Sequence, residues 1–311
     1  MKKLISLFLC LCLFCGCAAK EQTVEQDGFT FTDDLDRSIT IEEPQRVACL
    51  LGSFAQIWQL AGGEVGATAD DAWDDLQLEL AEDTVNLGNT KQLSLELLLD
   101  FQPDFILAST NTRQNVEWQE TLDAVKIPTA YFDVANFDDY LRLLEICCGI
   151  TGRNDLYEKN GLAVQKEIDA VLADSAKRIE ENGAPTVLSI RASASSVTVK
   201  NSQDNVLGEM LHSLGCENIA DSNAMLLENL SMEYILESDP DFVFFVQRGD
   251  DEEGMKAYVQ ENILSHPLWA QLSAVKEGKV FFMEKNLYNL KPNHRWGEAY
   301  EKLEAILSEN A

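Results

Sequence analysis

A segment of fourteen residues occurs twice in the chain. The copies are residues 93–106 (LSLELLLDFQPDFI) and 230–243 (LSMEYILESDPDFV), with seven identical positions. An internal repeat indicates two copies of one structural unit, and this spacing is too long for a solenoid. Each copy has a short helical pattern, then Pro-Asp and the apolar start of a strand. The repeat therefore predicts two related lobes, each with a glutamate in a first helical turn, Glu96 and Glu233.

The N-terminal residues have the pattern of an export signal. Two lysines precede an apolar run over residues 4–15, which is too short to span a bilayer and has the length of a signal h-region. Gly16-Cys17 resembles the end of a bacterial lipobox, in which Cys17 carries the lipid; an ordinary secretory signal is the alternative. We expect a signal peptide over 1–16 and a lipidated tether over 17–28, which would anchor the protein to the cell membrane on its extracytoplasmic side.

The chain is strongly acidic. Its formal net charge is −29, and loss of residues 1–16, which contain two lysines and no acid, would lower it to −31. Such a charge argues against nucleic acid or an anionic membrane face as a partner, since both carry negative charge. A basic docking surface on another protein remains a suitable partner.

Cysteine and histidine form no metal-binding or catalytic pattern. The cysteines outside the signal region have no CxxC spacing, and we interpret them as small hydrophobes, with a disulfide left open. The histidines form no HxH or HxxxH pair, so a bare metal site is not expected, although His294 could be a single axial haem ligand. Without GxSxG, a P-loop or a Cys/His pair, we expect no enzymatic activity. These residues are Cys49, Cys147, Cys148, Cys216, His212, His266 and His294.

Strand and helix patterns alternate in two blocks that flank a helical region. The first block has predicted strands at 46–51, 64–67, 105–108 and 129–132, and a helix at 54–61. The second has strands at 186–190, 242–246 and 280–283, and helices at 206–214, 256–263 and 298–307. In the region between them Asn136 is a good N-cap, and a helix from about Asn154 to Asn182 would be roughly 40 Å long.

This alternation predicts an α/β fold with two Rossmann-like α/β lobes, residues 29–135 and 184–311. A helical connector over 136–183 joins them, because its long helix can cross from one lobe to the other. The ligand cleft should lie between the lobes at the carboxyl ends of the strands, where open α/β sheets bind ligands.

Several motifs, taken in order, resemble the helical-hinge periplasmic binding proteins that serve ABC importers of ferric siderophores, haem and vitamin B12. The resembling segments are FTDDLDRSITI from Phe31, PQRV from Pro44, NLG from Asn86, SLE from Ser94, PDFI from Pro103 and HPLWAQLSAVKEGKV from His266. Asp36 replaces the usual glycine of the first segment. The resemblance covers nearly the whole mature chain and implies a monomer that works with a permease dimer and its ATPase.

The repeated glutamates acquire a role from this resemblance. In that family one glutamate per lobe docks into arginine pockets of the permease, and the motif assigns this role to Glu96 and Glu233. The alternative is that each merely complements its helix dipole. However, Asp100 and Glu237 lie four residues further on, and like charges at this spacing disfavour a helix. Because both lobes keep this arrangement, a basic partner explains it better.

The loops that follow the predicted strands supply the candidate ligand-binding residues. Arg191 and Arg248 directly follow strands, while Lys291 and Arg295 share a late loop. Cations gathered in an acidic chain indicate an anionic ligand held by charge-assisted hydrogen bonds. The alternatives are that these cations pair with surface acids and that the aromatics pack in the core. The full set is Ser53, Phe54, Trp73, Asn111, Arg191, Arg248, Tyr288, Lys291, Arg295 and Trp296.

Together these features predict a substrate-binding lipoprotein of an ABC importer that carries an anionic ferric siderophore. A corrinoid or haem is the alternative ligand. A sensor or adhesion lipoprotein that no longer serves a transporter is the alternative function, and the missing catalytic motif disfavours a tetrapyrrole-handling enzyme. The helical connector predicts only modest closure of the lobes.

Overall fold

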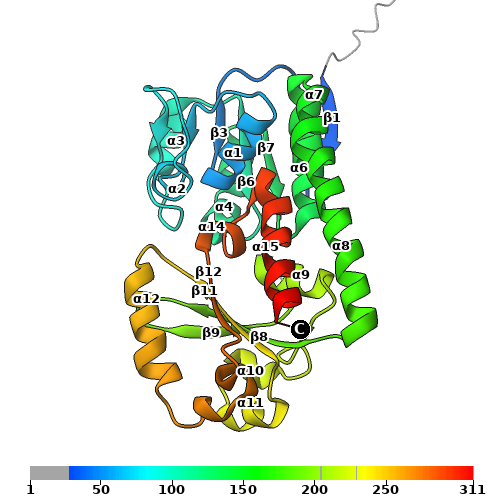
Figure 1. The fold of residues 1–311 in the computed structure, drawn as a ribbon. Helices are drawn as coiled ribbons and strands as arrows, with labels where there is room; N and C mark the ends of the chain where they lie inside the picture. Colours follow the sequence, from blue (N-terminus) through cyan, green and yellow to red (C-terminus); the bar gives the residue numbers. More distant parts are fainter. Residues whose placement is uncertain (1–27, 204, 229, 311) are drawn as a thin grey trace, which may run out of the picture.

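The computed structural model describes residues 28–203, 205–228 and 230–310. Two α/β lobes lie one above the other, and the long helix α8 runs along one side of them (Figure 1). This arrangement confirms the predicted fold class. The predicted signal peptide, the lipidation site Cys17 and the tether up to residue 27 lie outside the described residues.

The N-terminal lobe contains a parallel sheet with the strand order β5-β4-β3-β6-β7. Its strands are β3 (Val47–Cys49), β4 (Ala67–Thr68), β5 (Val85–Asn86), β6 (Phe105–Ser109) and β7 (Thr129–Phe132). Its helices are α1 (Gly52–Leu60), α2 (Asp71–Asp74), α3 (Leu95–Phe101), α4 (Arg113–Glu117) and α5 (Gln119–Ala124). A hairpin, β1 (Phe29–Thr32) and β2 (Ser38–Ile41), packs Phe31 against Phe105 and Phe132.

The connector follows the predicted pattern closely. Helix α6 (Phe137–Thr151) begins at a capping box in which Asn136 and Asp139 bond each other's backbone N–H groups, and it ends at Gly152 in the left-handed conformation. The next helix is continuous through α7 (Asn154–Tyr157), a π-helical turn η1 (Glu158–Leu162) and α8 (Ala163–Asn182). Within η1, Asn160 donates a hydrogen bond to the carbonyl of Leu60 at 2.8 Å, which ties the connector to the end of α1.

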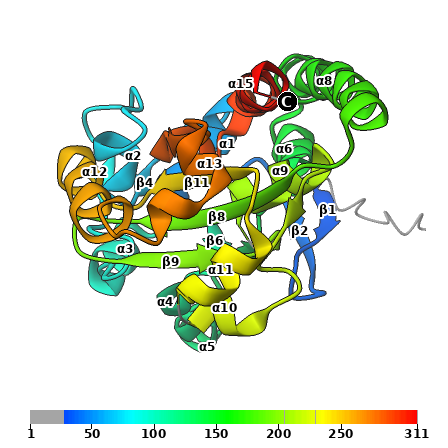
Figure 2. The same cartoon turned by 60° about the horizontal axis from the view of Figure 1, so that its bottom comes forward.

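The C-terminal lobe has a parallel sheet with the order β10-β8-β11-β12, and β9 pairs antiparallel with β8. Its strands are β8 (Thr186–Ala192), β9 (Val197–Lys200), β10 (Glu217–Asn218), β11 (Phe242–Gln247) and β12 (Val280–Met283). Its helical segments are α9 (Val206–Ser213), α10 (Ala224–Glu228), α11 (Met232–Ser238), α12 (Glu252–Val259), η2 (Gln260–Leu264), η3 (Trp269–Gln271) and α13 (Ser273–Lys276). In Figure 2, α10, α11 and α13 lie on the near side of this sheet.

The end of the chain returns toward the N-terminal lobe through α14 (Lys285–Tyr288), η4 (Asn293–Arg295) and α15 (Trp296–Glu309). Asn293 donates to the carbonyl of Ser53 at 3.0 Å and to the side chain of Gln56 at 2.7 Å, so η4 is fixed against α1. Helix α15 lies along α8, where the buried Arg178 forms a bidentate ion pair with Glu304 at 2.8 and 3.0 Å.

One cluster of buried apolar side chains runs through both lobes and the connector. It includes Phe105 of the first sheet, Leu144 of α6 and Phe242 of the second sheet. The described cysteines (Cys49, Cys147, Cys148 and Cys216) are all free and buried, which confirms that they serve as small hydrophobes. No helix among the described residues has the length and apolar character needed to cross a membrane.

The predicted strand at 64–67 differs from the structure, in which β4 is Ala67–Thr68. The backbone carbonyl of Glu64 does not take part in strand pairing and instead accepts a hydrogen bond from the indole N–H of Trp58 at 2.9 Å. Residues 64–66 therefore lead into the strand as irregular backbone rather than form its first half.

Candidate ligand-binding site

The first turn of α1 and helix α2 meet at the carboxyl edge of the N-terminal sheet. A carboxylate oxygen of Asp71 accepts the backbone N–H of Gly52 at 2.8 Å. A Cβ atom at Gly52 would lie 2.5 Å from the backbone nitrogen of Ala72, so only glycine permits this approach. Burial raises the pKa of Asp71 to about 6, although the N–H of Gly52 opposes the shift.

Lys291 lies against this edge of the N-terminal lobe. Its ammonium is 5.9 Å from the ring centroid of Phe54, within the range of a cation–π contact. Burial lowers the pKa of Lys291, and the charges of Asp133, Asp71 and Asp139 oppose the shift. Asn111 donates a hydrogen bond to Asp133. The predicted residues Phe54, Asn111 and Lys291 therefore share one neighbourhood, and the buried Ser53 is next to Phe54.

Arg191 and Arg248 come together at the carboxyl edge of the C-terminal sheet. Arg191 is the sixth residue of β8 and pairs with Val246 of β11, and the backbone N–H of Arg248 donates to the carbonyl of Ala192 at 2.7 Å. Burial and the neighbouring charge of Arg248 hold the pKa of Arg191 below its ordinary value. The Nε atom of Arg191 is buried and has no hydrogen-bond partner in the described residues.

These two arginines differ from the rest. Every other arginine in the described part of the chain hydrogen-bonds a carboxylate or a backbone carbonyl; their contacts involve Arg37, Arg46, Arg113, Arg142, Arg153, Arg178 and Arg295. Neither Arg191 nor Arg248 has such a side-chain partner among those residues. A guanidinium held near another positive charge without a counter-ion is a suitable site for an anionic group.

The other predicted residues occupy different environments. Arg295 forms a bidentate ion pair with Glu298 at 2.7 and 2.9 Å. Tyr288 is buried and its hydroxyl donates to the carbonyl of Ala299 at 3.0 Å. Trp296 is completely buried and packs against Phe137 and Tyr300. Of the three predicted aromatic contacts, only Trp73 on α2 retains exposed surface.

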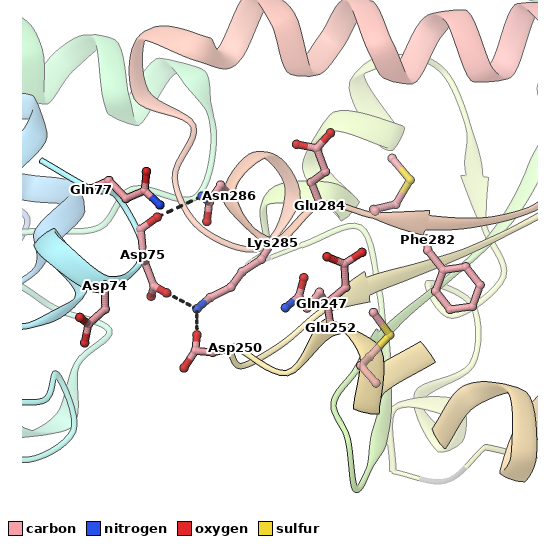
Figure 3. Close-up of a pocket in the computed structure, with 12 residues that line it drawn as sticks. Asp74, Asp75, Gln77, Gln247, Asp250, Glu252, Phe282, Glu284, Lys285 and Asn286 are labelled. Carbon is pink, nitrogen blue, oxygen red and sulfur yellow. Dashed lines mark hydrogen bonds and ion pairs between the residues drawn. The ribbon is translucent and has the colours of Figure 1, made fainter. Parts of the chain in front are cut away.

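A pocket of about 470 Å³ separates α2 of the N-terminal lobe from the ends of β11 and β12 in the C-terminal lobe (Figure 3). The ammonium of Lys285 contacts the carboxylates of Asp75 and Asp250, which come from the two lobes. Asn286 adds a hydrogen bond to the backbone carbonyl of Asp75 at 3.1 Å. The pocket is lined by Asp74, Asp75, Gln77, Gln247, Asp250, Glu252, Met255, Phe282, Met283, Glu284, Lys285 and Asn286.

The candidate set from the sequence missed Lys285 and its two aspartates. A signal for the lysine was present, because Lys285 follows the strand Val280–Met283 by two residues, as a cation in a post-strand loop. Nothing local singles out Asp75 or Asp250 in a chain with 53 acidic residues. Their role depends on a contact across the cleft, which only the fold creates.

Both repeat copies present their acids to solvent. Glu96 and Asp100 of α3 and Glu233 and Glu237 of α11 are exposed, and none has an ion-pair partner within the described residues. The two helices lie on different lobes (Figure 1). Their acidic surfaces are thus available to a partner.

Histidine adds no cluster to the site. His212, His266 and His294 are exposed, and the first two belong to segments outside the pocket described above. Across the described ranges, no group of three or more His, Cys, Asp or Glu side chains is arranged to hold a metal ion.

The sequence model of the periplasmic binding protein family matches residues 47–287. The chain belongs to the periplasmic binding protein family. This family consists of binding proteins, which confirms both the resemblance and the expectation that the chain is not an enzyme.

Relatives of this binding protein extend over most of its length. It is 24% identical to the Fe(3+)-citrate-binding protein YfmC of Bacillus subtilis over 92% of this chain and 91% of the relative. It is 25% identical to the ferric-anguibactin-binding protein FatB of Vibrio anguillarum over 88% of this chain and 86% of that protein. The crystal structure of Staphylococcus aureus SirA with staphyloferrin B superposes with a TM-score of 0.66 at 19% identity, covering 90% and 97% of the chains. This structure shares the fold.

Proposed function

We propose that this periplasmic binding protein captures an anionic ferric siderophore outside the membrane and delivers it to the permease of an ABC importer. The observation that carries the proposal is the pair formed by Arg191 and Arg248. These are the arginines without a side-chain partner in the described chain, and they lie at the carboxyl edge of a parallel sheet. An anionic group bound there would supply the counter-charge that none of the described residues provides.

The names of the relatives support an iron complex as the cargo. One relative is named for ferric citrate and another for ferric anguibactin. Lys291 would add a cation from the opposite side of the cleft, where it has the ring of Phe54 beside it. In this proposal Trp73 and Asn111 line the N-terminal side of the bound complex. Ser53 and the fully buried Phe54 support that side from the first turn of α1.

Haem and corrinoids receive less support from the same residues. A flat tetrapyrrole needs aromatic or aliphatic faces, yet Tyr288 and Trp296 are buried in the core. Trp73 alone of the proposed aromatics is partly exposed. A corrinoid would also leave Arg191 and Arg248 without a counter-ion.

Quenching of tryptophan fluorescence by ferric siderophores, haem and cobalamin tests this cargo. We expect Arg191→Met and Arg248→Met each to weaken the binding of a carboxylate or catecholate ferric siderophore by roughly ten- to a hundredfold, as loss of a charged hydrogen bond does. Arg295→Met is the matched control, because its guanidinium is already paired with Glu298 and its loss should leave affinity nearly unchanged. Equal losses in all three variants would contradict the proposal.

Delivery to a permease has a separate test. Glu96→Ala combined with Glu233→Ala should leave ligand affinity unchanged and abolish binding to the permease in membranes. Glu120→Ala with Glu301→Ala provides the control, because both are exposed glutamates outside the repeat. Normal permease binding by the first pair, or loss of ligand affinity, would exclude a docking role. Absence of permease binding by the unsubstituted protein would instead favour a sensor or adhesion lipoprotein.

A further inference from the structure

A single lysine links the two lobes at the pocket shown in Figure 3. Lys285 begins α14, two residues after Met283, which is paired in the sheet with Val246. This short connection makes Lys285 move with the C-terminal sheet. Its ammonium contacts Asp75, which directly follows α2 of the N-terminal lobe, and Asp250 of its own lobe at 2.5 Å.

The two carboxylates are not equivalent. The side chains of Lys285 and Asp75 are 13% and 19% exposed, whereas that of Asp250 is 83% exposed. Solvent screens an exposed ion pair strongly and a partly buried pair much less. The contact across the lobes is therefore the stronger arm of the bridge, and the contact within the C-terminal lobe is the weaker.

The acidic residues around the pocket give it a negative charge, and Lys285 offsets this charge so that the lobes can approach each other closely. Glu252 and Glu284 are paired on the outside with Lys256 and Lys302. The remaining lining acids, Asp74, Asp75 and Asp250, have Lys285 as the basic side chain of the pocket. Without that ammonium, aspartates from the two lobes would face each other as like charges across the cleft.

We propose that Lys285 is an electrostatic latch that holds the two lobes together when no ligand is bound. Opening of the cleft would break the contact between Lys285 and Asp75, together with the hydrogen bond from Asn286 to the carbonyl of Asp75, and leave the contact with Asp250 intact. The latch acts in the ligand-free protein. It is therefore an addition to the proposed function and does not depend on which ligand the protein carries. Its failure would not affect the arginine test, nor would failure of that test affect the latch.

Distances between spin labels on the two lobes would measure the latch directly. The exposed Glu82 and Glu261 can be changed to cysteine for labelling in a chain that starts at residue 18 and so lacks Cys10, Cys12, Cys15 and Cys17, because the described native cysteines are buried. Pulsed electron paramagnetic resonance on the ligand-free protein then gives the populations of closed and open distances. Thermal unfolding of each variant would establish that it remains folded.

We expect Lys285→Met to raise the ratio of open to closed protein by roughly three- to tenfold, since it removes a partly buried ion pair and leaves like charges facing each other. Asp75→Asn should raise the ratio of open to closed protein by less. It removes the attraction to Lys285 but also removes one of the negative charges that repel each other across the cleft. Asp250→Asn is the matched control and should leave the distances unchanged, because the arm across the lobes persists.

Two results would overturn the proposal. One is a distance distribution for Lys285→Met that superposes on that of the unsubstituted protein. The other is an opening by Asp250→Asn as large as that by Asp75→Asn, because the contact across the lobes would then have no special role. If a variant fails to fold, Lys285→Gln, which keeps a polar side chain, replaces Lys285→Met with the same expected direction.

Discussion

The two copies of the repeat form the same structural unit in the two lobes. In each, a seven-residue helix (α3 or α11) ends at a left-handed residue and leads through Pro-Asp into a buried strand. Asp104 accepts the backbone N–H groups of Gln45 and Arg46 just before β3, at 2.8 and 2.9 Å. Asp241 accepts the N–H and hydroxyl of Thr186 at the start of β8, at 2.7 and 2.8 Å. The repeated aspartate thus fixes the start of the neighbouring strand in both lobes.

The copies differ where their strands end. Strand β6 ends at Ser109 and continues into a neutral polar loop, in which Asn111 donates a hydrogen bond to Asp133. After β11 the chain continues with Arg248, which has no side-chain partner among the described residues and lies near Arg191. The framework has therefore been kept in both lobes while the loops that face the cleft have diverged. Changes in the shared core should act alike on the two copies, and changes at positions whose contacts differ should not.

The largest expected effect tests whether the two copies share one core. Phe105→Ala and Phe242→Ala remove equivalent buried rings and should each lower the free energy of unfolding by about 3–5 kcal/mol. Because one apolar cluster runs through both lobes, urea unfolding followed by circular dichroism should remain a single transition. Phe282→Ala, at a 37% exposed ring, is the control with a small effect. A second transition confined to one lobe would contradict a common core.

A smaller effect separates the copies at their helix ends. Gln102 and Asp239 both have positive φ, 53° and 38°, which favours glycine. Gln102→Gly should raise the free energy of unfolding by about 0.5–1 kcal/mol, as released backbone strain outweighs the added chain entropy. Asp239→Gly should lower it, because Asp239 also accepts the N–H and hydroxyl of Ser273 at 2.8 and 2.7 Å. Chemical denaturation measures both, and equal shifts would mean that the bonds to Ser273 contribute nothing.

The smallest expected effect is a difference in the pH dependence of stability between the same two positions, Gln102 and Asp239. The hydrogen bond from the Ser273 side chain, with that from its backbone, holds the pKa of Asp239 below its ordinary value of 3.8. The stabilisation is therefore present above pH 3.8 and is lost as the pH falls through the lower folded-state pKa. We expect Asp239→Asn to flatten the loss of stability in that acid range. Gln102→Asn, at a position that does not titrate, should leave the slope unchanged; an equal effect of both would contradict this assignment.

Much of the framework followed from the sequence because its determinants are local. The capping residue Asn136, the end of α6 at Gly152 and the strands at Thr129–Phe132 and Val280–Met283 all depend on neighbours within a few residues. The strand predicted at 64–67 shows the limit of such patterns. In the structure β4 is Ala67–Thr68, and the carbonyl of Glu64 bonds to Trp58 instead. The candidate site was less predictable. Arg191, Arg248 and Lys291 all lie at strand ends or in a late loop, and the sequence did not show which of these cations would lack an acidic partner among the described residues.

The sequence by itself determined that this protein has two related α/β units, a long helical connector and a matched pair of acidic helices. Periodicity, caps and a repeat specify these features through short-range geometry. Only the tertiary structure decided that Trp296 is buried and that Arg178 pairs with Glu304, 126 positions away. It also decided that Lys285 meets Asp75, 210 positions away in the chain. Burial and ion pairing depend on which distant segments are packed together, and that information is distributed over the whole chain.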